Sequence, residues 1–238
     1  MRNSKWFKLL VVPIILGFVI AVPAWLMAQE KRIETDKINV FAVVSENIQD
    51  QVKVATVDLK ITENVETFAL KGYQQHCTLY MTAYPLGRQK LVETIVRRIA
   101  NNTKQFPINT KGIEIAASDW LFMGLENNKE LQALCDEVAE RLAFLRAKSD
   151  YVPEWAKSMP AKVECIKKYG SPNVFSQFDP HLTLLAKSDG EMLRRFGIFC
   201  ADKEYNKPIA GKVIAIGYGL ADRDGQIKNP IRVFPLAE

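Results

Sequence analysis

The chain has 238 residues, of which 48% are hydrophobic, and a formal charge of +5. This length and composition allow one sizeable core and exclude a largely disordered chain. Arg2, Lys5 and Lys8 supply three of the positive charges, which leaves about +2 for the remainder. Such a balance excludes the broad basic footprint of proteins that grip long nucleic acids.

The N-terminus has the layout of a secretory leader. A basic stretch, MRNSKWFK, precedes an apolar run from Leu9 to Ala28, and polar residues follow. The run, about 20 residues long, could also span a bilayer, although two prolines and a glycine interrupt it. We therefore expect residues 1–28 to be a signal peptide or an N-terminal membrane anchor. Residues 29–238 are then one exported domain, periplasmic, secreted or held at the membrane.

The first predicted elements of this domain carry no visible chemistry. The apolar stretch INVFAVV, Ile38 to Val44, is typical of a strand. The segment from Val52 to Leu70 alternates in part, and we predict a second strand or extended segment there.

From Gln75 the strand pattern is sharper. In HCTLYMTAY, a period of two separates an apolar face from a polar one. We expect the apolar face to pack against a helix and the polar face to point outward. The polar face is predicted to carry His76, Thr78, Tyr80, Thr82 and Tyr84.

Helical and strand patterns then alternate along the chain. Residues 90–99 recur at helical spacing, 112–125 read as a strand, and Asn127 or Asn128 can cap a second helix that extends to Leu145. Between Lys148 and Asp179 three prolines punctuate the pattern, which predicts a connection with a short helical piece near its middle.

The stretch PHLTLL repeats the earlier strand, with His181, Thr183 and Leu185 expected on one face. A short helix, GEMLRRFGIF, follows, and late strands are predicted at Gly211 to Leu220 and Ile231 to Phe234. The chain thus contains a degenerate internal repeat, a strand beginning His-x-Thr-Leu followed by a helix and a strand, whose two starts lie 105 residues apart.

Both histidines of this chain precede a threonine by two residues and a leucine by three. Two imidazoles can serve as a general base and a general acid, and each threonine hydroxyl can hold an anionic oxygen between them. A phosphodiester fits such a site. Its transition state would be stabilised by hydrogen bonds and a protonated histidine, because the residues offer no conventional zinc site.

Four cysteines, Cys77, Cys135, Cys165 and Cys200, permit two disulfides with three possible pairings in an exported chain. Buried free thiols are the alternative, since a domain of this size needs no covalent staples. With disulfides, the chain could instead be a structural envelope protein.

At its two motifs the chain resembles the two-histidine (2H) phosphoesterase superfamily, which includes ligase-like enzymes and cyclic phosphodiesterases of RNA processing. HCTL at 76–79 and HLTL at 181–184 match the family's paired H-x-[TS]-x motifs. The resemblance implies an α+β, bilobal and pseudo-symmetric fold with two antiparallel sheets flanking a cleft and helices outside. It also implies cleavage of 2′,3′-cyclic nucleotide phosphates or 2′-5′ linkages without metal or cofactor.

Carried onto this chain, the resemblance makes His76 and His181 the acid and base, in an order that the sequence leaves open. Thr78 and Thr183 would hold the phosphate of a small nucleotide or a short RNA-derived phosphodiester. The alternative function is an exported envelope protein that binds a nucleotide or phosphate without turnover.

Other residues are weaker candidates for substrate contacts. Tyr80, Tyr84 and Tyr218 could stack on a base or simply cover the sheet. Arg88 or Lys187 could add positive charge near the phosphate or lie on a solvated surface.

Overall fold

The computed structural model describes residues 34–238. Residues Ile33–Glu238 form one compact unit, and its main hydrophobic core extends from Ile38 to Leu236. A chain that starts at Gln29 therefore contains the complete core of this unit. The expected leader, residues 1–28, lies outside the described residues. Within 34–238, the structure contains no helix with the length and apolar character needed to cross a membrane.

The unit combines seven strands with five α-helices in the described residues. The strands are β1 (Thr35–Val44), β2 (Cys77–Pro85), β3 (Phe106–Ile115), β4 (Leu121–Leu125), β5 (His181–Leu185), β6 (Ala210–Leu220) and β7 (Arg232–Pro235). The helices are α1 (Glu46–Glu63), α2 (Gln89–Asn102), α3 (Lys129–Leu142), α4 (Pro160–Tyr169) and α5 (Gly190–Cys200), with short 3₁₀ turns between them.

All seven strands belong to one antiparallel sheet in the order β1-β2-β5-β4-β3-β6-β7, and β1 also pairs with β6. The α+β class is as expected, but the expectation of two separate sheets is wrong. The long strand β6 pairs with β3 through residues 210–213 and with β7 through residues 215–218, so it belongs to both halves. At the other junction, β2 and β5 meet at the pair Cys77–Leu182.

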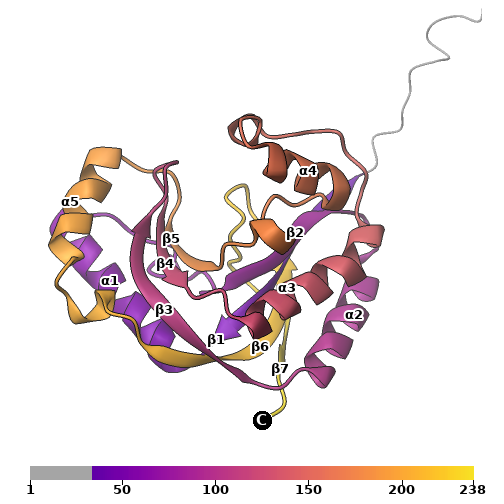
Figure 1. Ribbon diagram of the computed structural model, residues 1–238, viewed down its shortest axis with the longest axis horizontal. Helices are drawn as coiled ribbons and strands as arrows, with labels where there is room; N and C mark the ends of the chain where they lie inside the picture. The colour runs from indigo at the N-terminus through magenta and orange to yellow at the C-terminus, as the bar shows by residue number, and fades with distance from the viewer. Residues whose placement is uncertain (1–33) are drawn as a thin grey trace, which may run out of the picture. The chain divides into compact units, whose positions relative to one another are not determined.

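Two pairs of helices cover the outside of the curved sheet, α1 with α5 and α2 with α3 (Figure 1). The predicted helices at 90–99 and after Asn128 are confirmed as α2 and α3. In α3, the side chain of Asn128 accepts a hydrogen bond from the backbone N–H of Leu131, which caps the helix. The buried faces of α2 and α3 recur at helical spacing and pack on the sheet.

The predicted strand or extended segment after Val52 is wrong, because residues 46–63 form helix α1. The buried residues include Ile48, Val52, Ala55 and Leu59, which are spaced three or four apart and form one helical face. The apparent alternation came from valines on the solvent side, such as Val54 and Val57, which are about half exposed.

The strand-like pattern at 112–125 divides into β3 and β4, which form a hairpin. Asp119 adopts a left-handed backbone conformation, with φ of 62°, in the turn between them. The predicted connection between Lys148 and Asp179 is confirmed, and its short helical piece is α4.

Candidate functional site

The two His-x-Thr motifs lie side by side because strands β2 and β5 are antiparallel partners. Cys77 pairs with Leu182, and both side chains are buried in the core on the helix side of the sheet. Neighbouring residues of a strand point to opposite faces of the sheet. The residues on either side of Cys77 and of Leu182 therefore point to the face without helices. This register sets His76 across from Thr183 and Thr78 across from His181. We call the surface that carries these four side chains the histidine face.

A β-bulge follows each motif and explains the shared leucine. Phe41 pairs with Thr78 and Val40 with Tyr80, so Leu79 is an extra residue in β2. In the same way Phe122 pairs with Thr183 and Leu121 with Leu185, which leaves Leu184 unpaired in β5. A bulge changes the alternation of side chains. Each leucine and the residue after it are therefore both buried in the core.

Backbone carbonyls fix both imidazole rings in the same way. Nδ1 of His76 lies 2.8 Å from the carbonyl oxygen of Gln74, and Nδ1 of His181 lies 2.8 Å from that of Asp179. A carbonyl can only accept, so each neutral ring carries its proton on Nδ1. In each ring Nε2 is then the atom that accepts a proton from a substrate or water.

A phenylalanine supports each imidazole from a neighbouring strand. Phe41 of β1 meets His76 edge to face, with ring centroids 5.2 Å apart. Phe122 of β4 stacks on His181 at 3.9 Å. Gly217 of β6 makes room for the first contact, because a Cβ there would lie 2.5 Å from the Phe41 ring. The two phenylalanines occupy equivalent positions, opposite Thr78 and Thr183, but contact their histidines in different geometries.

Asn39 of β1 is a fully buried polar residue that contacts one motif only. Its Nδ2 lies 3.1 Å from Nε2 of His76, 2.8 Å from Oγ1 of Thr78 and 3.0 Å from the carbonyl oxygen of Gly225. The two hydrogens of this amide serve Thr78 and Gly225, and its nitrogen offers no acceptor for a second proton on Nε2 of His76. Asn39 therefore favours the neutral form of His76.

The electrostatic surroundings of the two histidines differ. The pKa of His76 is lowered to about 4, mainly by burial and in part by the charge of His181, although the Gln74 carbonyl and Asp222 oppose the shift. Burial also lowers the pKa of His181, and Lys111, which pairs with Glu114, adds to this shift, whereas the Asp179 backbone and the carboxylates of Asp179 and Glu114 oppose it. His181 is also more exposed than His76. The site thus holds one strongly neutral imidazole and one beside acidic groups.

Comparisons with solved structures place this arrangement in a known fold. E. coli LigT complexed with 3'-AMP matches with a TM-score of 0.53 and 14% identity, over 86% of this chain and 100% of LigT. TT0787 of Thermus thermophilus matches with a TM-score of 0.51 and 12% identity, over 84% of this chain and 97% of its own. The chain therefore has the same fold as LigT. No family model and no curated protein matches the sequence.

The surroundings of the two motifs repeat in part. The two motifs meet at the Cys77–Leu182 pair. On each side of this pair a backbone carbonyl holds the histidine, and a bulge follows the threonine. All four residues expected from the motifs, His76, Thr78, His181 and Thr183, belong to the histidine face.

The three candidate stacking residues do not lie on the histidine face. Because of the bulge at Leu79, Tyr80 and Tyr84 turn toward the helices and are fully buried. The Tyr80 hydroxyl donates to the backbone carbonyl of Tyr169 at the end of α4. Tyr218 is 1% exposed, and its hydroxyl donates to Glu93 of α2 at 2.9 Å. The expectation that these rings stack on a base is therefore wrong.

Several residues near the site were missed by sequence reasoning. Asn39 is a lone polar residue inside an apolar strand pattern, and this exception in the sequence could have marked it as a candidate. Glu114 of β3 lies over Gly124, where a Cβ would come within 2.3 Å of its carboxylate, and Gly124 pairs with His181. Nothing in the local sequence marks Glu114, because only the order of β3, β4 and β5 brings it there.

The remaining sequence expectations concern cysteines and metals. Cys77, Cys135, Cys165 and Cys200 are all free and buried, which corrects the possibility of a disulfide scaffold. Among residues 34–238, no three side chains of histidine, cysteine, aspartate or glutamate gather as ligands of a metal ion. Arg88 lies directly before α2, and Lys187 lines a small hollow with Phe68 and Arg223.

Proposed function

We propose that this chain is a phosphodiesterase that hydrolyses 2′,3′-cyclic nucleotide phosphates or 2′-5′-linked nucleotides with His76 as general base and His181 as general acid. The observation that supports it most is the pairing of Cys77 with Leu182, because this register gathers two imidazoles and two hydroxyls on one face.

In the proposed reaction, Nε2 of His76 takes a proton from water as the water oxygen attacks phosphorus. The bond from phosphorus to one ribose oxygen breaks, and His181 gives its proton to that oxygen. A 2′,3′-cyclic phosphate then gives a monophosphate on one of the two hydroxyls and frees the other, and a 2′-5′ linkage gives one fragment with a phosphate and one with a hydroxyl. The hydroxyls of Thr78 and Thr183 donate hydrogen bonds to the non-bridging phosphate oxygens, where negative charge increases in the transition state.

The difference between the two surroundings supports this division of roles. A general base must be neutral when the substrate binds, and burial together with Asn39 favours neutral His76. A general acid must be protonated; burial lowers the pKa of His181 too, but the Asp179 backbone and the carboxylates of Asp179 and Glu114 oppose this shift. Groups whose surroundings separate their pKa values are the usual acid and base of such a pair.

Solved structures with the same fold support a nucleotide as the ligand. E. coli LigT has been seen with 3'-AMP and, at a TM-score of 0.52 and 13% identity, with phosphate. We extend this ligand class to the present chain because its histidine face offers the hydrogen-bond donors that a phosphate needs.

The proposal is tested by turnover of a panel of 2′,3′-cyclic and 2′-5′-linked nucleotides by residues 29–238 in the presence of a chelator. We expect hydrolysis that the chelator does not abolish. The value of kcat/KM should peak between about pH 4 and pH 6.5, because the pKa of His76 is lowered to about 4 and that of His181 lies below its usual 6.5. Saturable binding by calorimetry without product would favour the alternative, a nucleotide-binding protein.

Replacing either threonine of the motifs should weaken the reaction. We expect Thr78→Val or Thr183→Val to lower kcat/KM about 10- to 100-fold, since each removes one hydrogen bond to a charged oxygen. Thr82→Val is the matched control, because Thr82 lies on the same strand but turns away from the histidine face. An equal loss in Thr82→Val would show that strand β2, rather than the hydroxyl, is responsible.

A further inference from the structure

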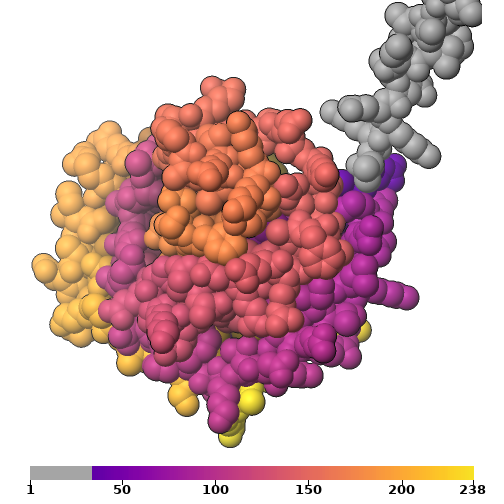
Figure 2. All heavy atoms as spheres, turned by 45° about the vertical axis from the view of Figure 1, so that its right-hand side comes forward, coloured from indigo at the N-terminus to yellow at the C-terminus, as the bar shows by residue number. Residues whose placement is uncertain are grey.

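The segment from Arg146 to Tyr169 forms a compact projection that the proposed reaction does not use. Its ends are joined, because the Arg146 guanidinium donates to the carbonyl oxygens of Lys167 and Lys168 at 3.0 and 3.1 Å. The hydrogen bond from Tyr80 to Tyr169 attaches it to the helix side of β2. Figure 2 shows the segment and the loop after it, in salmon and orange, as an outer layer of the molecule.

This projection exposes large apolar side chains that a soluble surface normally buries. Tyr151 is 73% exposed, Trp155 52% and Met159 44%, all within nine residues of chain. Leu86, 52% exposed, follows the end of β2, and β2 binds the start of the projection through the hydrogen bond from Ala147 to Ala83. Trp and Tyr with one polar end suit the boundary between lipid and water.

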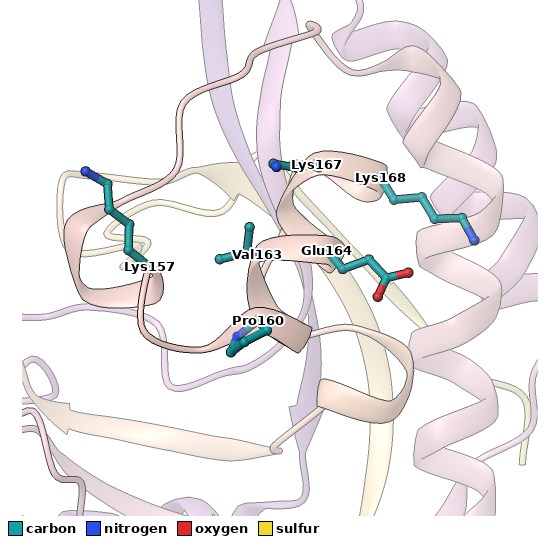
Figure 3. Close-up of a pocket in the computed structure, with 6 residues that line it drawn as sticks. All are labelled: Lys157, Pro160, Val163, Glu164, Lys167 and Lys168. Carbon is teal, nitrogen blue, oxygen red and sulfur yellow. The ribbon is translucent and has the colours of Figure 1, made fainter.

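Positive charge accompanies these apolar side chains. Between residues 146 and 169 the chain has six lysines and arginines and three acidic residues. Lys157, Lys167 and Lys168, with Glu164, Val163 and Pro160, line a hollow of about 630 Å³ beside α4 (Figure 3). The ammonium groups of Lys157 and Lys168 extend away from α4 in Figure 3, although Glu154 pairs with Lys157 at 2.6 Å. Exposed lysines attract anionic lipid headgroups.

The N-terminal end of the described chain lies beside the same surface. The backbone N–H of Leu86 donates to the carbonyl of Glu34 at 3.1 Å. Glu34 is six positions after Ala28, where the apolar run ends, and six steps of an extended chain span at most about 20 Å. A run embedded in a bilayer would therefore keep Leu86 and its neighbours within reach of the lipid headgroups.

We propose that this surface docks on an anionic bilayer, with Leu86, Tyr151, Trp155 and Met159 at the lipid boundary and Lys148, Lys157, Lys167 and Lys168 on the headgroups. We call it the docking surface. Binding combines apolar burial with attraction to anionic lipid, and each contribution alone is weak. Single-stranded nucleic acid is the competing ligand for exposed aromatics and lysines, but it offers no reason for Met159 and Leu86 to be exposed.

The test uses residues 29–238, which contain the complete core, and measures co-sedimentation with vesicles. We expect binding to phosphatidylcholine vesicles that contain about 30% phosphatidylglycerol, little binding to phosphatidylcholine alone, and a decrease as salt is added. The triple variant Trp155→Ser, Lys157→Glu, Lys168→Glu should bind at least about tenfold more weakly.

The matched control changes α1, at the other end of the sheet. Ile61→Ser with Lys53→Glu and Lys60→Glu removes an apolar group that is 74% exposed and the same number of lysines, and it should leave vesicle binding unchanged. Urea unfolding of every variant checks that the fold is intact. Equal binding to neutral vesicles, no binding at all, or equal losses in the two variants would overturn the proposal. Binding of a single-stranded oligonucleotide instead of vesicles, lost in the triple variant, would assign the docking surface to nucleic acid.

Discussion

Replacement of either histidine by glutamine is expected to lower kcat for a cyclic phosphodiester by about three orders of magnitude or more, because each change removes one proton transfer from the transition state. Glutamine can keep a hydrogen bond to the carbonyl of Gln74 or Asp179 but cannot exchange a proton at neutral pH. His76→Gln and His181→Gln should therefore fold normally and retain nucleotide binding. Steady-state kinetics with calorimetric binding measures both effects.

The double variant and a control sharpen this expectation. Residues that act as a unit lose activity non-additively, so His76→Gln with His181→Gln should cost little more than the worse single change. Tyr218→Phe is the control, because its hydroxyl contacts Glu93 behind the sheet. Full activity in either histidine variant would contradict the proposed function. A large loss of kcat in Tyr218→Phe would contradict the placement of the site on the histidine face.

The second large effect concerns stability at acid pH. The pKa of His76 is lowered to about 4 by burial, whereas the unfolded chain keeps a value near 6.5. Above pH 6.5 the imidazole is neutral in both states. As the pH falls through this window, only the unfolded chain takes up the proton, so stability decreases. His76 alone should remove roughly 3 kcal/mol from the free energy of unfolding by about pH 4.

The variant His76→Gln isolates this contribution, since an amide does not titrate. Urea unfolding of the wild type and the variant at about pH 7.5 and about pH 4.5 gives the comparison. We expect the wild type to lose roughly 2 to 3 kcal/mol more than the variant between the two conditions. Parallel losses would mean that the folded protein accepts a proton on His76 easily, and the assignment of this residue as the neutral base would fail with it.

The residues of the histidine face could be predicted from the sequence because His-x-Thr is a local pattern on a strand. A period of two determines that a histidine and the threonine two residues later share a face, wherever the strand lies. The same rule failed after Thr78, because a bulge depends on the partner strand and leaves no mark in the residues themselves. Tyr80 and Tyr84 were assigned to the wrong face for this reason.

The segment after Val52 illustrates a different limit. Its buried residues have helical spacing, but valines on the solvent side gave the stretch a partial alternation that resembles a strand. Local composition could not decide between these two periods. Packing against α5 and β6 decides it in the folded chain, because only the helical face is buried there.

The sequence by itself determined the α+β class, most of the helices and strands, and the two motifs that make a phosphodiesterase the proposed function. Tertiary structure decided that the sheet is continuous, which histidine is the more buried, and that Asn39, Phe41, Phe122 and Glu114 surround the pair. The physical reason is that strand periodicity is a property of neighbouring residues. Burial, pKa and the partners of a side chain depend on strands that are distant in the sequence and become neighbours only when the chain folds.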